Sequence, residues 1–351
     1  MTADAYRRII AAPQLDRRDL FLSAANRLAA PVGNIEKDFW VCWTLNVLYH
    51  RLPAGGPRLL FKGGTSLSKA HGLINRFSED IDVTVFRDDI NQTASIQDLQ
   101  SLSKNKRRAK LDAIRDACHE YITGPFLGAV AGALTEDTAG TGRIEVDRTD
   151  PDGQTLLVWY PTVEPASDGY VQPVVRIESG AKSALDPHRR VLIRPYIGEE
   201  LPDIDLAIAD VTTIEPGRTF WDKVVIAHGL RRWYERRGAL RQEGQRISRH
   251  YYDLHCLLGA AVGRAALADI ALAGDCVAHA RMFFDRSDYD LATAVPGTFA
   301  IAPPGGMVDA LRRDYENTSA MVFGKAPSFD EILVSILAID AAVNGVGSNV
   351  P

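Results

Sequence analysis

A glycine pair followed, one helix-length later, by an acidic pair is the feature of this sequence that most limits its fold. The two blocks are Phe61-Lys62-Gly63-Gly64-Thr65-Ser66 and Ser78-Glu79-Asp80-Ile81-Asp82. The first block closes a short apolar run that predicts a buried strand, and its threonine or serine can begin a helix. In the second, Asp80 and Asp82 alternate with apolar residues, which predicts another strand. The order of strand, glycine turn, helix and strand therefore predicts a compact α/β unit.

The same two blocks predict a site for a nucleotide and a metal ion. Residues i and i+2 of a strand point to one face, so Asp80 and Asp82 place two carboxylates side by side. A divalent cation such as Mg²⁺ relieves their repulsion and also binds phosphates. A glycine turn at the start of a helix offers backbone N–H groups to a triphosphate. An Asp-x-Asp pair alone is more often a solvated strand face, so the prediction depends on the order of the blocks. The residues predicted to bind the nucleotide phosphates are Gly63, Gly64, Thr65 and Ser66.

This order of elements resembles the DNA polymerase β-like nucleotidyltransferase superfamily, and the resemblance implies a third carboxylate on a neighbouring strand. Glu178 is the first choice, because the run ending there alternates and places Glu178 on one face with Arg176. Glu145 and Asp147, on an earlier predicted strand, are the rivals. An ion pair of Glu178 with Arg176 or Lys182 remains an equal alternative.

Two charged residues stand out in the helical second half. Lys223 lies on or beside the apolar stripe of an amphipathic helix, where a lysine usually extends to solvent but can instead deliver a charge to a triphosphate. Asp253 follows Arg249 by four residues, the spacing of a helix-surface ion pair. The intervening stretch is rich in arginine, and such a run is either a solvated surface or a contact for an RNA backbone. The arginines are Arg231, Arg232, Arg236, Arg237, Arg241, Arg246 and Arg249.

Several blocks together resemble the AbiEii/AbiGii-type nucleotidyltransferase toxins of bacterial toxin–antitoxin and abortive-infection systems. The blocks are FKGGTSLSKAHGLINRFSEDIDV, VVRIESGAKS, PGRTFWDKVVIAHGL, SRHYYDL and MVFGKAPSFDEIL. The resemblance implies a nucleoside triphosphate substrate, Mg²⁺, a cognate antitoxin and an acceptor RNA, with the 3′ end of tRNA as the expected target. It implies that Asp80 and Asp82 bind the metal, that Lys223 binds the triphosphate and that Asp253 is the carboxylate of the helical domain. Transfer to a protein side chain and a non-catalytic binding module remain the alternatives.

The expected fold is α/β (α+β), a polymerase β-like nucleotidyltransferase core with a mixed sheet, N-terminal helices and a C-terminal helical domain. The expected boundaries are 1–56 for the N-terminal helices, 57–215 for the core and 216–351 for the helical domain. Four widely spaced cysteines and the lack of any apolar run of about 18 residues favour a cytoplasmic protein without a membrane segment. The net charge of −5 means that any RNA contact must use a local basic surface, either the arginine run or the run from Lys104 to Lys110. The latter run lies in a long polar helix expected from about Ile96 to Thr123.

Overall fold

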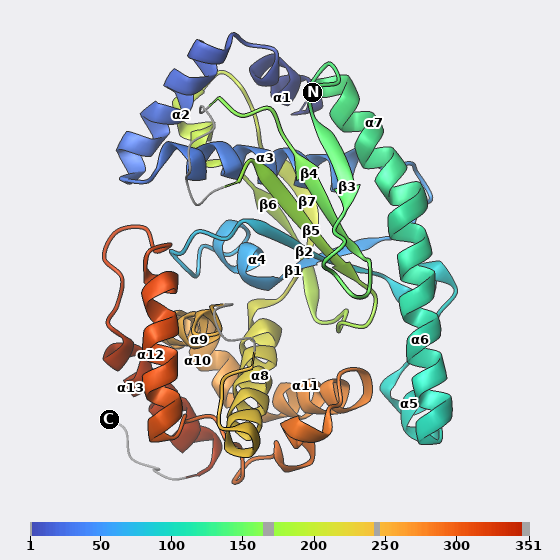
Figure 1. The fold of residues 1–351 in the computed structure, drawn as a ribbon, viewed down its shortest axis with the longest axis vertical. Helices are drawn as coiled ribbons and strands as arrows, with labels where there is room; N and C mark the ends of the chain where they lie inside the picture. The colour runs from blue at the N-terminus through green and yellow to red at the C-terminus, as the bar shows by residue number, and fades with distance from the viewer. Residues whose placement is uncertain (1, 164–171, 242–245, 346–351) are drawn as a thin grey trace. The chain divides into compact units, whose positions relative to one another are not determined.

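The computed structural model describes residues 2–163, 172–241 and 246–345 (Figure 1). The chain divides into two compact units, and the boundary does not follow the sequence in one step. The first unit contains Met1–Ala70, Phe77–Ala94 and Leu102–Ile214. The second contains Glu215–Pro351 together with two short pieces, His71–Arg76 and Ser95–Ser101, that interrupt the first unit in sequence.

The first unit is built on a seven-stranded mixed sheet with the strand order β3-β4-β5-β2-β1-β7-β6. Its centre is antiparallel between β1 and β2 and parallel between β2 and β5 and between β1 and β7. The strands are β1 (Leu59–Lys62), β2 (Asp80–Val85), β3 (Arg143–Val146), β4 (Thr155–Trp159), β5 (Val174–Gly180), β6 (His188–Ile193) and β7 (Ile208–Ile214). The predicted fold class, a mixed sheet accompanied by N-terminal and C-terminal helices, is confirmed.

Helices of the first unit cover one face of the sheet and run along one of its sides. In Figure 1, α3 passes behind the sheet, where it packs on β5 and β7, and α6 and α7 follow one another along the side. A π turn, Ile122–Phe126, joins these two helices and contains Pro125, which has no N–H to donate. The helices are α1 (Thr2–Ile10), α2 (Gln14–Leu28), α3 (Val32–His50), α4 (Gly63–Lys69), α6 (Lys104–Tyr121) and α7 (Leu127–Asp137).

The helix predicted from Ile96 to Thr123 is two helices, which belong to different units. The short helix α5 (Ile96–Ser101) lies in the second unit, and α6 begins after Ser103. The Ser103 hydroxyl accepts a hydrogen bond from the backbone N–H of Lys106, so it caps α6. A local serine cap therefore restarts the helix where its polar composition alone predicted continuity.

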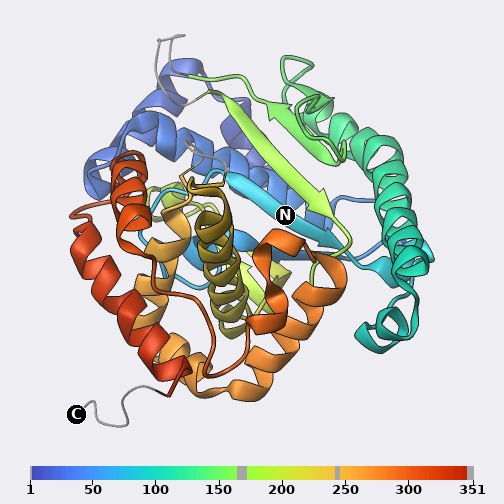
Figure 2. The same cartoon turned by 60° about the horizontal axis from the view of Figure 1, so that its bottom comes forward.

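The second unit is helical, with α8 surrounded by the other helices (Figure 2). Most of the first four turns of α8 are buried, including Phe220, Trp221 and Lys223. Within the part of the chain that the structure describes, no helix combines the length and apolarity needed to cross a membrane. The helices after β7 are α8 (Pro216–Arg237), α9 (Arg249–Gly259), α10 (Ala261–Ala268), α11 (Ile270–Phe283), α12 (Gly305–Ser319) and α13 (Phe329–Val343).

Candidate active site

Four charged residues share one face of the central sheet. In the parallel pairing of β2 with β5, Asp80 is opposite Arg176 and Asp82 is opposite Glu178. Residues opposite one another on paired strands point to the same side. The intervening Ile81 is buried on the other side of the sheet. We call the face formed by Asp80, Asp82 and Glu178 the acid face.

The glycine turn touches this face directly. Gly63 follows β1, has a φ of +77°, and lies so close to Asp82 that an added Cβ would be 1.9 Å from the Asp82 Oδ2 atom. Only glycine meets both conditions, because other residues are strained at this φ and have a Cβ to place. The preceding residue, Lys62, is opposite Asp82 on β1, and its Nζ is 3.8 Å from Asp82 Oδ1. The first predicted block is therefore in contact with the second.

The hydroxyl groups of the turn hold it in place. Thr65 and Ser66 are both fully buried. The Thr65 hydroxyl donates to the backbone carbonyl of Asp80 and lies 2.8 Å from the Ser78 hydroxyl. The Ser66 hydroxyl donates to the carbonyl of Gly63 at 2.8 Å. These two predicted binding residues thus use their side chains to fix the turn against β2, and their contribution to a phosphate would come from the backbone.

Buried charges on α3 fix the same elements from behind. Lys37 forms an ion pair with Glu79, the residue before the acid face. Asp38 pairs with Lys69 at the end of α4 at 2.7 Å, and both side chains are about 95% buried. Burial raises the pKa of Asp38, with the Lys69 charge acting against it. A buried charge that loses its partner is strongly destabilising. These two ion pairs therefore fix α4 and the start of β2 against α3.

The candidates for the third carboxylate occupy different places. Glu178 is next to Asp82 and is partly exposed. Glu145 is on the edge strand β3, where it accepts from the Trp159 indole at 2.8 Å and pairs with an arginine of its own strand. Asp147 follows β3 and is almost completely buried, with one oxygen 2.7 Å from Arg176 Nη2. The strand register therefore brings Glu178, and neither rival, beside the aspartate pair.

The donors of the acid face fit Mg²⁺ in kind. Two carboxylates are enough for Mg²⁺ when water and substrate phosphates complete its coordination. Among the residues that the structure describes, no three acidic, histidine or cysteine side chains converge as a preformed metal cage. Arg176 lies between the carboxylates instead, with its Nε 4.0 Å from Asp80 and 3.8 Å from Glu178.

The second unit contains a separate buried cluster of charges around Asp253. The side chain of Asp253 is fully buried, and Lys223 Nζ lies 2.8 Å from its Oδ2. Arg76 donates to both oxygens of Asp253, at 2.8 and 2.9 Å. Arg76 belongs to the short piece His71–Arg76, which also pairs with the chain around Val322. The Lys223 side chain therefore does not extend to solvent, and Asp253 does not form an ion pair on the surface of α9.

The protonation behaviour of this cluster follows from burial and charge. Burial alone would raise the pKa of Asp253, but the charges and hydrogen bonds of Arg76 and Lys223 outweigh it and hold that pKa far below its usual range. Burial lowers the pKa of Lys223, and attraction by Asp253 opposes this shift only in part. With the three groups ionised, the cluster carries one net positive charge.

Four arginines of the run form ion pairs within the second unit. Arg231 and Arg232 pair with Glu235 at 2.8 and 2.9 Å. Arg236 and Arg237 bind the turn around Asp288, and Arg237 does so at 2.8 Å. Arg241 lies over the rings of Trp233 and Tyr289. These contacts assign the arginines a structural part in joining α8 to the turn that follows α11.

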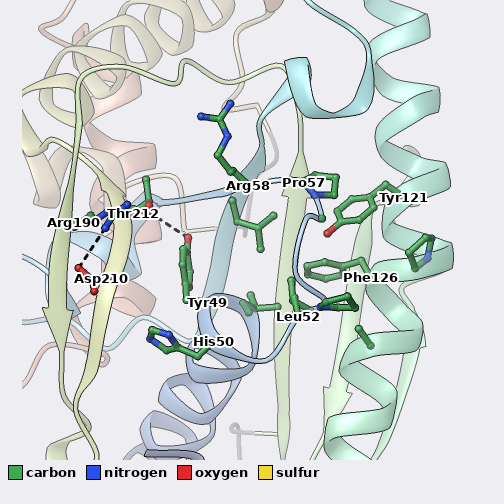
Figure 3. Close-up of a pocket in the computed structure, with 16 residues that line it drawn as sticks. Tyr49, His50, Leu52, Pro57, Arg58, Tyr121, Phe126, Arg190, Asp210 and Thr212 are labelled. Carbon is green, nitrogen blue, oxygen red and sulfur yellow. Dashed lines mark hydrogen bonds and ion pairs between the residues drawn. The ribbon is translucent and has the colours of Figure 1, made fainter.

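A cavity of about 560 Å³ lies at the start of β1, the end opposite the glycine turn (Figure 3). Tyr121 and Phe126 form an aromatic wall, and Arg190 and Asp210, 3.9 Å apart, form a polar one. None of the residues predicted for catalysis or nucleotide binding lines it.

Sequence reasoning missed the residues that hold the predicted ones. Arg76 was inside a recognised block, yet no local spacing connects it with Asp253, 177 residues away. Lys37 and Asp38 look like an ordinary polar stretch of a helix, and only their burial distinguishes them.

Comparison with known proteins identifies the class. The family model described as nucleotidyl transferase AbiEii toxin of type IV toxin–antitoxin systems matches residues 46–335. The chain belongs to this family and is a nucleotidyltransferase toxin of a toxin–antitoxin system. A solved structure, the nucleotidyltransferase toxin MenT4 from Mycobacterium tuberculosis H37Rv, is similar over 93% of this chain and 99% of its own, with 16% sequence identity and a TM-score of 0.38. No curated protein matches the sequence.

Proposed function

We propose that the protein transfers a nucleotide from a nucleoside triphosphate to an RNA acceptor, the 3′ end of tRNA, in a Mg²⁺-dependent reaction that blocks translation. The observation that carries the chemistry is the contact of Gly63 with Asp82 on a strand paired with Glu178. This contact puts a turn suited to phosphates against carboxylates suited to Mg²⁺. The tRNA acceptor is supported by the family resemblance of the sequence blocks.

In this proposal Asp80, Asp82 and Glu178 hold Mg²⁺, and the backbone of Gly63, Gly64, Thr65 and Ser66 receives the phosphates. When bound, Mg²⁺ supplies positive charge to the phosphates and lowers the pKa of the attacking hydroxyl. The acceptor hydroxyl oxygen forms a bond to the α-phosphorus while the bond from that phosphorus to the β-phosphate oxygen breaks. Pyrophosphate leaves, and the hydroxyl proton passes to solvent. The fixed turn keeps the carboxylates and the amide donors in place throughout.

Lys223 is the proposed binding group for the triphosphate, and Asp253 and Arg76 position it. A short contact to a fully buried carboxylate orients the lysine, and Arg76 keeps that carboxylate ionised. The excess positive charge of the cluster favours an anion such as a triphosphate.

The acceptor surface that the charges favour is the start of α6. Lys104, Lys106 and Arg108 are exposed there. Arg108 has Asp112 at 4.0 Å, whereas no ion pair of Lys104 or Lys106 is found among the described residues. Positive charge that is not neutralised within the fold is available to phosphates. This segment is therefore a better candidate for RNA contact than the arginine run.

The test is incubation of the purified protein with each of the four α-labelled nucleoside triphosphates, Mg²⁺ and total tRNA. We expect label on the tRNA and its loss in Asp82→Asn, and chelation of the metal should stop transfer. If the label appears on protein instead, the acceptor is a protein side chain and the tRNA proposal is wrong. No transfer with any of the four nucleotides, together with no nucleotide binding, would reject it.

A further inference from the structure

We propose that Arg176 is a nucleotide-binding residue that contacts the triphosphate, and that Asp147 positions it. This inference deepens the proposed function and rests on it. Arg176 projects from the middle of β5 onto the acid face, opposite Asp80 in the strand register. The proposal assigns functions to one residue outside the predicted catalytic set and to one that had been a rival for the third carboxylate.

Charge balance on the acid face favours a cation of this kind in addition to Mg²⁺. A triphosphate carries three to four negative charges, and it must approach a face that already has three carboxylates. Arg176 and Lys62 are the cations that the sheet places among them, and Lys62 is near Asp82. A guanidinium presents several N–H donors in a planar fork that matches phosphate oxygens, which suits Arg176 to this contact.

The contacts of Arg176 leave its donors available. Among the described residues, its one short ion pair is to Asp147, at 2.7 Å, whereas Asp80 and Glu178 are 4.0 and 3.8 Å away, beyond hydrogen-bond distance. The side chain is 39% exposed, so a ligand can reach it. Movement of Arg176 toward a phosphate would also take a competing cation away from Glu178, a proposed metal ligand.

Asp147 is built as a fixed anchor. Its carboxylate accepts from the backbone N–H of Thr149 at 2.8 Å and from the Thr149 hydroxyl at 2.7 Å. It is almost completely buried, which prevents it from turning toward the acid face. Arg176 is therefore held at one end, and its position over the carboxylates is maintained before any ligand arrives.

The sheet offers a matched control in Arg143 and Glu145. They form an arginine–carboxylate pair with the same 2.7 Å separation, on the edge strand β3, and Arg143 also stacks on Trp159. This pair tests the loss of an arginine from the sheet without changing the acid face. The variants are Arg176→Ala, Arg176→Gln and Asp147→Asn, with Arg143→Ala and Glu145→Gln as controls.

The experiment measures equilibrium binding of non-hydrolysable analogues of the four triphosphates, and of Mn²⁺ alone, by calorimetry. We expect Arg176→Ala and Arg176→Gln to weaken triphosphate binding at least tenfold while the controls stay within twofold of wild type. Asp147→Asn should weaken binding about threefold to tenfold, because Arg176 remains but is less well positioned. Binding of Mn²⁺ without nucleotide should be unchanged or tighter in the Arg176 variants, because a competing cation has been removed.

Triphosphate binding by the Arg176 variants at the wild-type affinity would overturn the inference and leave Arg176 as a counter-ion of the carboxylates. If the Arg176 variants do not fold, Asp147→Asn decides: an affinity within twofold of wild type would likewise overturn the inference. A wild-type protein that binds none of the four analogues would instead reject the proposed function. The two failures are therefore distinguishable.

Discussion

Removing the charge of Asp253 should both destabilise the second unit and move the pH range in which the enzyme works. In Asp253→Asn, Arg76 and Lys223 keep their positions but lose the buried carboxylate that both contact. Breaking a buried ion pair by removing one partner costs about 3–5 kcal/mol. For a unit of this size, that loss lowers the melting temperature by about 6–20 °C.

The magnitude for Lys223 follows from the 2.8 Å contact. At an effective dielectric constant of about 20, removing a unit charge at this distance takes away about 6 kcal/mol of attraction. Repulsion from Arg76 is unchanged, so the pKa of Lys223, already lowered by burial, falls further when the Asp253 charge is removed. If the charged lysine binds the triphosphate, the alkaline limb of the kcat/KM profile must move to lower pH.

The contribution of Asp253 to the free energy of unfolding changes with pH only at the acid end. The folded pKa of Asp253 is depressed, so its contribution is complete above the unfolded value of about 3.9 and is lost only as pH falls through the folded pKa. Asp253→Asn should therefore be less stable than wild type across the neutral range, and the two should converge only in strong acid.

Thermal melts and kcat/KM profiles between pH 6 and 10 measure both effects. Asp330→Asn is the matched control, because the Asp330–Arg312 pair is 2.7 Å long but exposed, and its melt should not change. A triple variant, Arg76→Met with Lys223→Met and Asp253→Leu, replaces every charge of the cluster by an apolar side chain. It should be more stable than Asp253→Asn but inactive, because Lys223 is absent. If Asp253→Asn has the same melting temperature as the Asp330→Asn control and keeps the wild-type pH profile, the cluster neither stabilises the unit nor sets the charge of Lys223.

The remaining predictions concern the acid face and the two basic segments. Asp82→Asn should reduce transfer at least a hundredfold and leave the melting temperature nearly unchanged, because a partly exposed strand position tolerates loss of a charge. Gly63→Ala should cost about 1–2 kcal/mol for the left-handed backbone and also displace Asp82, so activity should fall at least tenfold, and unchanged kinetics would contradict the 1.9 Å approach. Reversing Lys104 and Lys106 to Glu should weaken tRNA binding and reduce its salt dependence without altering triphosphate binding, whereas reversing Arg236 should mainly lower the melting temperature. The opposite pattern would assign the RNA contact to the arginine run.

The sequence predicted the local parts of the site because those parts have local causes. Alternation around Asp80 and Asp82 and the glycine turn both depend on neighbouring residues, and the structure has a strand and a turn there. The choice among Glu178, Glu145 and Asp147 depends instead on which strands pair and in which register. Strand pairing joins residues almost 100 positions apart, so no spacing in one sequence encodes it.

The surroundings of the predicted residues were the harder part, since burial decides their chemistry. Lys223 was expected either to reach solvent or to bind phosphate. Instead it contacts the buried Asp253, a carboxylate that it shares with Arg76 from a segment far away in the chain. The helix break at Ser103 was readable in principle, since serine is a common N-cap, but the polar run on both sides obscured it.

The two basic segments show why a count of charges does not locate a nucleic-acid surface. The arginine run has more cations than the start of α6, and by sequence it is the stronger candidate. Its acids come partly from the same helix, as Glu235 does, and partly from Asp288, about 50 residues later. Each such pair removes a charge that an RNA phosphate would otherwise neutralise, and counterion release depends only on the charges that remain. The exposed lysines Lys104 and Lys106 have no ion pair among the described residues, so the charges of both remain available to RNA phosphates.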